Sequence, residues 1–402
     1  MAYAAKHDQP RGNLSDLYPR WLGARELLLH RRNPYSREIT LEVQEGYYGR
    51  RLDPARDDDP KDQQAFAYPI YVVFLLAPLI GLPFHTVQIL FYWMLIGLTV
   101  LSALLWLHTL QWSRSIPVVF MTTALMLGSF PAVQGFKLQQ LTLLVAALIA
   151  IAAFCIANRW LLAGGLMLAL ATIKPQLAWP TILWMVVWAV SDWKARRRVV
   201  LSFIAGMGAL LVGAELVLSG WASFFLKALR EYHQYTHNES VLDLLVNGLL
   251  GRFGGDILAG MAVGLTAIVL WRGRNENLEA EQFGRQLALV LALTVLIVPM
   301  FAPYNQVLLL PSILSLWRER TRVMTGAASV RVLFVAGLVA VVWPWIATIT
   351  LTAIWFASHD RALELWKLPL YSTFALPVLV FALSVVSIPS QRSILRFQAA
   401  AE

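Results

Sequence analysis

The stretch that decides the fold is QQAFAYPIYVVFLLAPLIGLPFHTVQILFYWMLIGLTVLSALLWLHTLQWS, residues 63–113, which lies between Asp62 and Arg114. It contains no Asp, Glu, Lys or Arg. One unpaired charge at the centre of a bilayer costs about 2.5–3.5 kcal/mol on insertion scales, so chains that cross membranes avoid charges there. Soluble domains of ordinary composition have no such gap. The stretch therefore predicts surroundings of hydrocarbon rather than water.

The whole chain has the composition of an all-α polytopic membrane protein. Of its 402 residues, 58% are hydrophobic and 14% are charged, against about 25% charged in soluble domains. This length has room for about nine or ten transmembrane helices. The net charge of +9 comes from short basic loops rather than from a compact basic domain, so no nucleic acid partner is expected. The single cysteine, Cys155, excludes an intrachain disulfide.

Three regions differ in composition. Residues 1–65 are polar, with 11 Lys or Arg and 11 Asp or Glu, and are predicted to form an extracytoplasmic loop. Within it, residues 17–32 place apolar side chains on one face and Arg20 elsewhere, as in an amphipathic helix at a membrane interface. Residues 66–388 are the predicted transmembrane bundle, with an outer loop at 220–255. Residues 389–402 are a predicted cytoplasmic tail.

Prolines and charges mark the ends of the predicted helices. Residues 66–82 are interrupted by Pro69 and Pro78 and are expected to form a juxtamembrane or re-entrant helix. The expected spans are 87–110, 116–133, 138–157, 199–219, 257–271, 286–301, 307–317, 332–356 and 370–388. Between them, the apolar stretch 159–194 is divided by Lys174-Pro175 into two short helices.

The distribution of Lys and Arg predicts the orientation of the chain. Basic residues are concentrated in the loops that include 194–198 and 318–322, and such loops mark the cytoplasmic side. The loop 220–255 and the N-terminal 65 residues then face outward. Because an outward N-terminal segment needs a preceding signal or span, we expect a further helix upstream of the first residue.

Two ionisable residues are the strongest candidates for chemistry. Asp16 begins the 17–32 helix, where it is either an N-cap or a carboxylate that accepts a proton from a substrate hydroxyl. Lys174 lies between two apolar half-helices, where an ammonium needs an anion, water or a path to the interface. Breaks of this kind are typical of transport sites and lipid-phosphate sites.

Other polar residues are expected to gather with these two at the outer face. The substrate-binding candidates are Tyr18, Tyr68, Lys137, Gln139, Gln140, Asn247, Tyr304, Asn305 and Gln306, with Arg252 as a second cation. His233 and His237 are spaced for one helix face, but a pair without a third ligand is more often solvated, and no metal is assigned. Such a set suits an anionic, lipid-linked substrate that reacts with a polar acceptor.

Several motifs resemble the polyprenol-phosphate-mannose-dependent glycosyltransferases of family 87, which have the GT-C fold. In chain order they are Asp16-Leu-Tyr-Pro, Gly23-Ala-Arg-Glu-Leu-Leu, Asn33-Pro34-Tyr35, Phe66-Ala-Tyr68-Pro69, Ala77-Pro78-Leu, Leu82-Pro83, Ala163-Gly164, Ala169-Leu-Ala-Thr-Ile-Lys174-Pro175, Asn247-Gly248 and Ala302-Pro303-Tyr304-Asn305-Gln306. The resemblance covers most of the chain. The sequence departs from the family at Leu138-Gln139-Gln140, where Gly-Gln is usual, and at Asn305-Gln306, where a histidine pair is usual.

The resemblance implies a GT-C-type helical bundle and a reaction. A sugar, by family mannose, would pass from a polyprenyl phosphate to a glycolipid or glycan in one inverting displacement at the outer face of the bacterial cytoplasmic membrane. Asp16 would be the base, and Lys174 and Arg252 would bind the donor phosphate. No cofactor is assigned, because members of this fold differ in metal dependence. The alternatives are a transporter or flippase of a lipid-linked anion and a catalytically silent family member.

Overall fold

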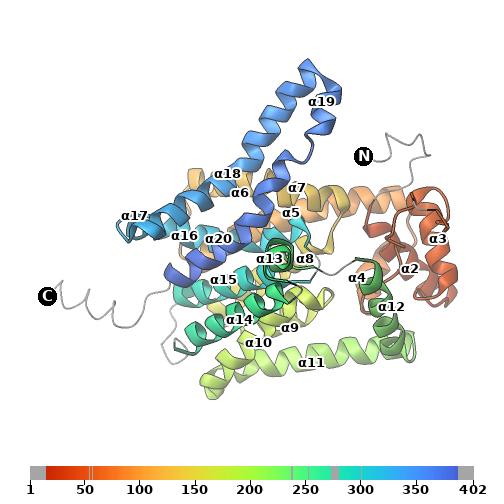
Figure 1. Cartoon of the computed structure of the whole chain (residues 1–402). Coiled ribbons are helices and arrows are strands. Elements are labelled where there is room, and N and C mark those ends of the chain that lie inside the picture. The colour runs from red at the N-terminus through yellow and green to blue at the C-terminus, as the bar shows by residue number, and fades with distance from the viewer. Residues whose placement is uncertain are drawn as a thin grey trace.

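The computed structural model describes residues 15–53, 55–56, 58–236, 239–251, 253–272, 280–299 and 301–387 of the chain. Every regular element within these ranges is a helix. Figure 1 shows a bundle of helices from which α18 and α19 project, with α2 and α3 gathered at one end beside α4 and α12. The prediction of an all-α polytopic membrane protein is confirmed.

The helices follow the chain in three groups. The first comprises α2 (Leu17–His30), α3 (Arg37–Tyr48), α4 (Val72–Leu76) and the 3₁₀ helix η1 (Ala77–Leu79). The second comprises α5 (Phe84–Thr109), α6 (Ile116–Leu127), α7 (Phe130–Leu138), α8 (Leu141–Ala157), α9 (Leu161–Ala171), α10 (Pro175–Ser191) and α11 (Trp193–Val217). The third comprises α12 (Trp221–Thr236), α13 (Val241–Leu250), α14 (Gly254–Arg272), α15 (Ala280–Ile297), η2 (Pro303–Leu309), α16 (Leu310–Arg318), α17 (Arg320–Met324), α18 (Ala328–Ala357), α19 (His359–Glu364), η3 (Leu368–Leu370) and α20 (Tyr371–Ser387).

Several helices are suited to crossing a membrane. Among the described residues, α5, α11, α14, α18 and the segment His359–Ser387 are long and apolar enough to do so. The pair α6 and α7 is bent by 56° and adds a sixth if the two halves form one span. Shorter apolar helices, including α8 and α9, pack among them. The chain is therefore a multi-pass membrane protein.

Four expected spans differ from the observed helices. Those expected over 138–157 and 286–301 correspond to α8 and α15, which are apolar but shorter than the helices that are long enough to cross a membrane. The helix expected over 116–133 ends at Leu127 because Ser129 accepts a hydrogen bond from the backbone of Ala132 and starts a new helix, with Pro131 in its first turn. The span expected over 307–317 is instead η2 followed by the nine-residue α16. A helix of that length extends about 14 Å, too short for a hydrocarbon layer of about 30 Å.

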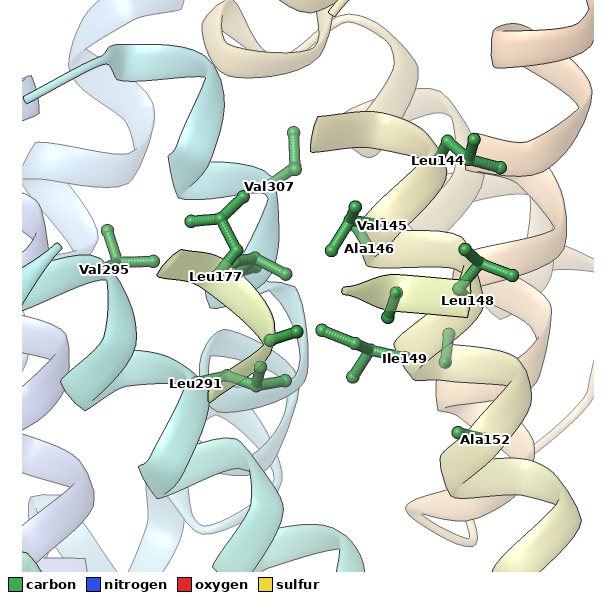
Figure 2. Close-up of a cluster of buried hydrophobic side chains, with 14 of the residues drawn as sticks. Leu144, Val145, Ala146, Leu148, Ile149, Ala152, Leu177, Leu291, Val295 and Val307 are labelled. Atoms are coloured by element: carbon green, nitrogen blue, oxygen red, sulfur yellow. The ribbon is translucent and has the colours of Figure 1, made fainter. Parts of the chain in front are cut away.

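The centre of the bundle is α8. Its buried residues lie all around the helix, which is the pattern of a core helix rather than of one facing lipid. The helices α5, α9, α10 and α15 pack against it. Figure 2 shows Val145 and Ile149 of α8 in one buried cluster with Leu177 of α10 and Leu291 of α15. Such packing, rather than exclusion of water, stabilises helix contacts within a bilayer.

The expected break at Lys174-Pro175 is confirmed. Helix α9 ends at Ala171 and α10 begins at Pro175, which occupies the first helical position, where its missing N–H costs nothing. The intervening residues include Thr172, whose hydroxyl donates to the carbonyl of Ala169. Lys174 is the N-cap residue of α10 and therefore lies at the junction of two half-helices.

The N-terminal helix α2 differs from an amphipathic helix lying on a membrane. It begins at Leu17 as predicted, but its polar residues Arg20 and Glu26 are buried as well as its apolar ones. Arg20, which the pattern places off the apolar face, is buried because its guanidinium contacts Tyr68 and the backbone of Asp16. The pattern showed which residues share a face but not which face another element covers.

A glycine on α9 sets its approach to α11, and its replacement tests that packing. A Cβ at Gly165 would lie 2.1 Å from Ser202 Oγ and 2.2 Å from the carbonyl oxygen of Val199. We expect Gly165→Ala to destabilise the protein by about 1–3 kcal/mol through overpacking, measured by thermal unfolding in detergent. The control is Gly208→Ala on α11, where a Cβ meets no atom within 4 Å. Equal melting temperatures for both variants would contradict the close helix contact.

Candidate active site

A cavity of about 490 Å³ lies where the N-terminal segment meets the bundle. Its walls come from the start of α2, the segment 62–69, the start of α8, the break between α9 and α10, helix α12 and η2. Its polar lining residues are Asp16, Arg20, Asp62, Gln64, Tyr68, Gln140, Lys174, Gln176, Tyr232, His233, Tyr304 and Asn305. The cavity is large enough for a small-molecule substrate, since ligand pockets measure about 300–1,000 Å³.

Asp16 is held so that its carboxylate points into this cavity instead of capping its helix. It occupies the N-cap position of α2, but its side chain makes no capping hydrogen bond. The backbone N–H of Asp16 donates to the carbonyl of Leu138 at 3.0 Å, which ties the segment to the end of α7. Its two oxygens accept hydrogen bonds from Tyr47 Oη, at 3.1 Å, and from Gln140 Nε2. The capping interpretation is therefore wrong.

The surroundings of Asp16 favour a carboxyl group that is less acidic than usual. Burial raises the pKa of Asp16 above its ordinary value, because the charged form loses hydration. The charge of Arg20 and the hydrogen bond from Tyr47 oppose this effect. Asp62 lies in the same cavity lining, and burial also raises its pKa. The cavity thus contains two carboxyl groups, and only Asp16 is tied to the bundle through Gln140.

Lys174 is buried, with 5% of its surface exposed, and its ammonium is hydrogen-bonded. Its Nζ donates to Gln140 Oε1 at 3.1 Å and to Thr142 Oγ1 at 2.8 Å. It also lies 5.1 Å from the centre of the Tyr304 ring, within the range of a cation–π contact. A buried ammonium needs such acceptors because it is costly to leave unpaired. None of these partners is anionic, which leaves the positive charge available to an anionic ligand.

Gln140 connects the acid and the amine. It is the N-cap residue of α8; its Oε1 accepts from Lys174 and its Nε2 donates to Asp16. The preceding residue, Gln139, adopts a left-handed conformation with φ of 53°, which ends α7 and turns the two amides apart. Asp16 and Lys174, 158 positions apart in the sequence, thus share one amide and one cavity.

A second cation, Arg20, lies beside Asp16 one helical turn along α2. Its guanidinium donates to the backbone carbonyl of Asp16 and to the hydroxyl of Tyr68, and it stacks 4.3 Å above the Tyr68 ring. Its Nε is buried without a hydrogen-bond partner among the described residues. An unpaired buried N–H is costly, so a ligand oxygen at this position would be favourable. Together Arg20 and Lys174 make the cavity suitable for an anion.

The late motif, Ala302-Pro303-Tyr304-Asn305-Gln306, has side chains on two different sides of η2. Tyr304 and Asn305 line the cavity, and Asn305 Oδ1 accepts a hydrogen bond from Thr142 at 3.0 Å. Gln306 does not line it: its Nε2 donates to the carbonyl of Thr373 on α20, at 2.6 Å. The predicted substrate contact at Gln306 is therefore not part of this cavity.

Four other predicted contacts lie away from the cavity. Tyr18 packs edge-on against Phe84, and Gln139 contacts Ser15 and the backbone of Gln88. Lys137 is exposed at the end of α7, and Asn247 accepts from the Gly255 N–H and closes the turn between α13 and α14. These residues form structural contacts or face outward. Arg252 and His237 lie outside the described residues, whereas His233 lines the cavity.

Sequence reasoning missed four residues of the cavity network. Arg20 could have been found from its spacing of four residues from Asp16, which places both on one helix face. Thr142 lies two positions after Gln140 at the start of α8, a spacing that does not place the two on one helix face. Tyr47 and Asp62 carry no such local signal, because α3 and the segment after it reach the cavity only through tertiary packing.

A family model described as glycosyltransferase family 87 matches residues 66–299, more than half of the chain. The chain belongs to this family. It is therefore a membrane glycosyltransferase, which acts on a sugar donor and an acceptor. Comparisons with curated proteins and with solved structures found no match. The family match includes Gln140 and Lys174 but not Asp16 or Tyr304, so the roles of the latter two depend on the geometry described above.

The contact between Tyr47 and Asp16 predicts how the carboxyl group titrates. Because Tyr47 Oη stabilises the charged form, Tyr47→Phe is expected to raise the pKa of Asp16 further above its ordinary value. The protonated-carboxyl band in an infrared titration, identified by its loss in Asp16→Asn, should then persist to higher pH. The matched control is Tyr48→Phe, since Tyr48 donates to the backbone of Asp62 and not to Asp16. Identical titrations of both variants would contradict the contact.

Proposed function

We propose that this family 87 glycosyltransferase transfers mannose from a polyprenyl-phosphate donor to a hydroxyl of a glycolipid or glycan acceptor. The reaction takes place at the outer face of the bacterial cytoplasmic membrane. The observation that supports it most directly is the link from Asp16 through Gln140 to Lys174 within one cavity. This link places a carboxylate and a cation where a hydroxyl nucleophile and a phosphate leaving group would be needed.

The proposed reaction is a single displacement with inversion. Asp16 takes the proton of the acceptor hydroxyl as the oxygen forms a bond to the anomeric carbon. The bond between that carbon and the donor phosphate oxygen breaks, and its electron pair leaves with polyprenyl phosphate. Lys174 and Arg20 stabilise the phosphate as its charge increases. Arg252 remains a candidate for the same task. The raised pKa of Asp16 suits a base, because the carboxylate of a weaker acid accepts a proton more readily.

The geometry favours transfer over transport of a lipid-linked anion. Both activities would use a cation at the break between α9 and α10. A transporter has little need for a carboxylate from the N-terminal segment at the same position, because it removes no proton from its cargo. Here Asp16 lines the cavity and is connected to Lys174 by one side chain. Together with family membership, this arrangement supports covalent chemistry.

The base assignment is tested by comparing the two carboxylates of the cavity. Purified protein in lipid nanodiscs is incubated with radiolabelled polyprenyl-phosphate mannose and a membrane lipid extract, and labelled product is counted. We expect Asp16→Asn to lower the transfer rate by roughly 10²–10⁴-fold, the usual contribution of a general base. The transfer rate of Asp62→Asn should fall far less, because the Asp62 carboxylate accepts hydrogen bonds from Gln64 and not from Gln140. A larger loss of transfer in Asp62→Asn than in Asp16→Asn would reassign the base to Asp62.

The role of Lys174 predicts a separate effect on the donor. In the same assay, Lys174→Met keeps the apolar stem and removes the charge, so the apparent KM for the donor should rise roughly 10- to 100-fold. The control is Lys137→Met, since Lys137 is exposed and lies outside the cavity. An unchanged donor KM in Lys174→Met would argue against phosphate binding at this position.

A further inference from the structure

A second cavity, of about 560 Å³, lies on the other side of η2. It is lined by α6, the start of α7, α16, α18 and α20, and its walls are almost entirely apolar. Among the described residues that line it, none is charged. Its volume is within the range of about 300–1,000 Å³ for ligand sites. The transfer reaction proposed above does not use it.

Two buried polar groups in this cavity have unsatisfied hydrogen-bonding atoms. Gln306 is 4% exposed and Ser372 is 8% exposed, and both line the cavity. The Nε2 of Gln306 is bonded to Thr373, but its Oε1 has no partner among the described residues, and neither has Ser372 Oγ. A buried acceptor without a donor is energetically unfavourable. A ligand that brings an O–H or N–H to this position would remove that cost.

One wall of the cavity is also the outer surface of the bundle. Met121 and Leu125 of α6 and Leu338 and Val342 of α18 line the cavity and are at least 40% exposed. Because α18 is long and apolar enough to cross a membrane, this surface is expected to face hydrocarbon. A molecule entering here therefore comes from the bilayer rather than from water.

We propose that this cavity binds a neutral lipid, with an apolar chain along α18 and α20 and an uncharged hydroxyl-bearing head at Gln306 and Ser372. The head donates a hydrogen bond to Gln306 Oε1 and exchanges one with Ser372 Oγ. A charged head is disfavoured, because it would lack a counter-ion in an apolar pocket. The apolar chain of the lipid supplies van der Waals contacts that the lining side chains would otherwise lack.

The position of Gln306 connects this site to the first cavity. Asn305, the residue before it, accepts the hydrogen bond from Thr142, which in turn accepts from Lys174. Both residues belong to the short η2 helix, so a ligand that holds Gln306 also holds the turn on which Asn305 and Tyr304 are carried. The lipid would thereby order one wall of the first cavity without contacting the transferred sugar.

Photolabelling of the full chain in nanodiscs tests the proposal. Two probes carry the same diazirine in a palmitoyl chain: a monoacylglycerol, which has hydroxyl donors, and a methyl ester, which has none. We expect the monoacylglycerol to label peptides of α18 and α20 roughly 3- to 10-fold more than the methyl ester does, because it makes one additional hydrogen bond. Binding is read directly by mass spectrometry, so the result does not depend on sugar transfer.

Two pairs of variants assign the label to the cavity. Ser372→Ala should lower glyceride labelling about threefold or more and leave the methyl ester unchanged, whereas Ser384→Ala, equally buried on α20 but outside the cavity, should change neither. Ala340→Phe should reduce labelling by both probes through filling the space. The exposed neighbour Val339 serves as its control, as Val339→Phe leaves the cavity open.

Three results would overturn the proposal. Equal labelling by the two probes would mean an apolar lipid contact without recognition of a head group. Labelling that Ala340→Phe does not reduce would mean that the lipid binds elsewhere on the surface. Absence of label from α18 and α20 would mean that water alone meets the polar atoms of Gln306 and Ser372.

Discussion

The structure depends on satisfying one buried ammonium. Lys174 lies among apolar helices, where an unpaired charge would be costly, and the break between α9 and α10 places it there. Its neutral acceptors both come from the start of α8, the central helix of the bundle. This requirement fixes how α8 faces α10, and the positive charge is hydrogen-bonded by neutral acceptors only. A site for an anionic group follows from the same arrangement that stabilises the fold.

The N-terminal segment completes the site because it docks onto the same amide. The backbone of Asp16 is bonded to Leu138, and its carboxylate accepts from Gln140, the residue that also accepts from Lys174. One glutamine thus orients a carboxylate and a cation toward a common space, as preorganised sites require. Arg20, buried against Tyr68, adds a second cation to the same cavity. Polar residues that would each be costly to bury alone are stabilised by hydrogen bonds to one another.

Most helices and the break between α9 and α10 could be predicted from the sequence, but only part of the site could. Long apolar runs gave α5, α11, α14 and α18 because their composition alone marks them. Lys174 interrupts an apolar stretch, Asp16 precedes a predicted helix, and Gln140 lies at the start of an apolar run, and the structure brings these three residues into one cavity. Arg20 and Tyr47 were missed, because their roles arise where α2 and α3 pack against other elements. Periodicity identifies the residues that share a face, whereas the partner of that face is a tertiary property.

The late motif shows how one short helix can serve two cavities. In a 3₁₀ helix successive residues point about 120° apart, so neighbours face different sides. Asn305 therefore contacts Thr142 beside the first cavity, while Gln306 reaches Thr373 and the second, apolar cavity. Neither amide side chain titrates, so the connection between the two cavities consists of hydrogen bonds and needs no proton carrier.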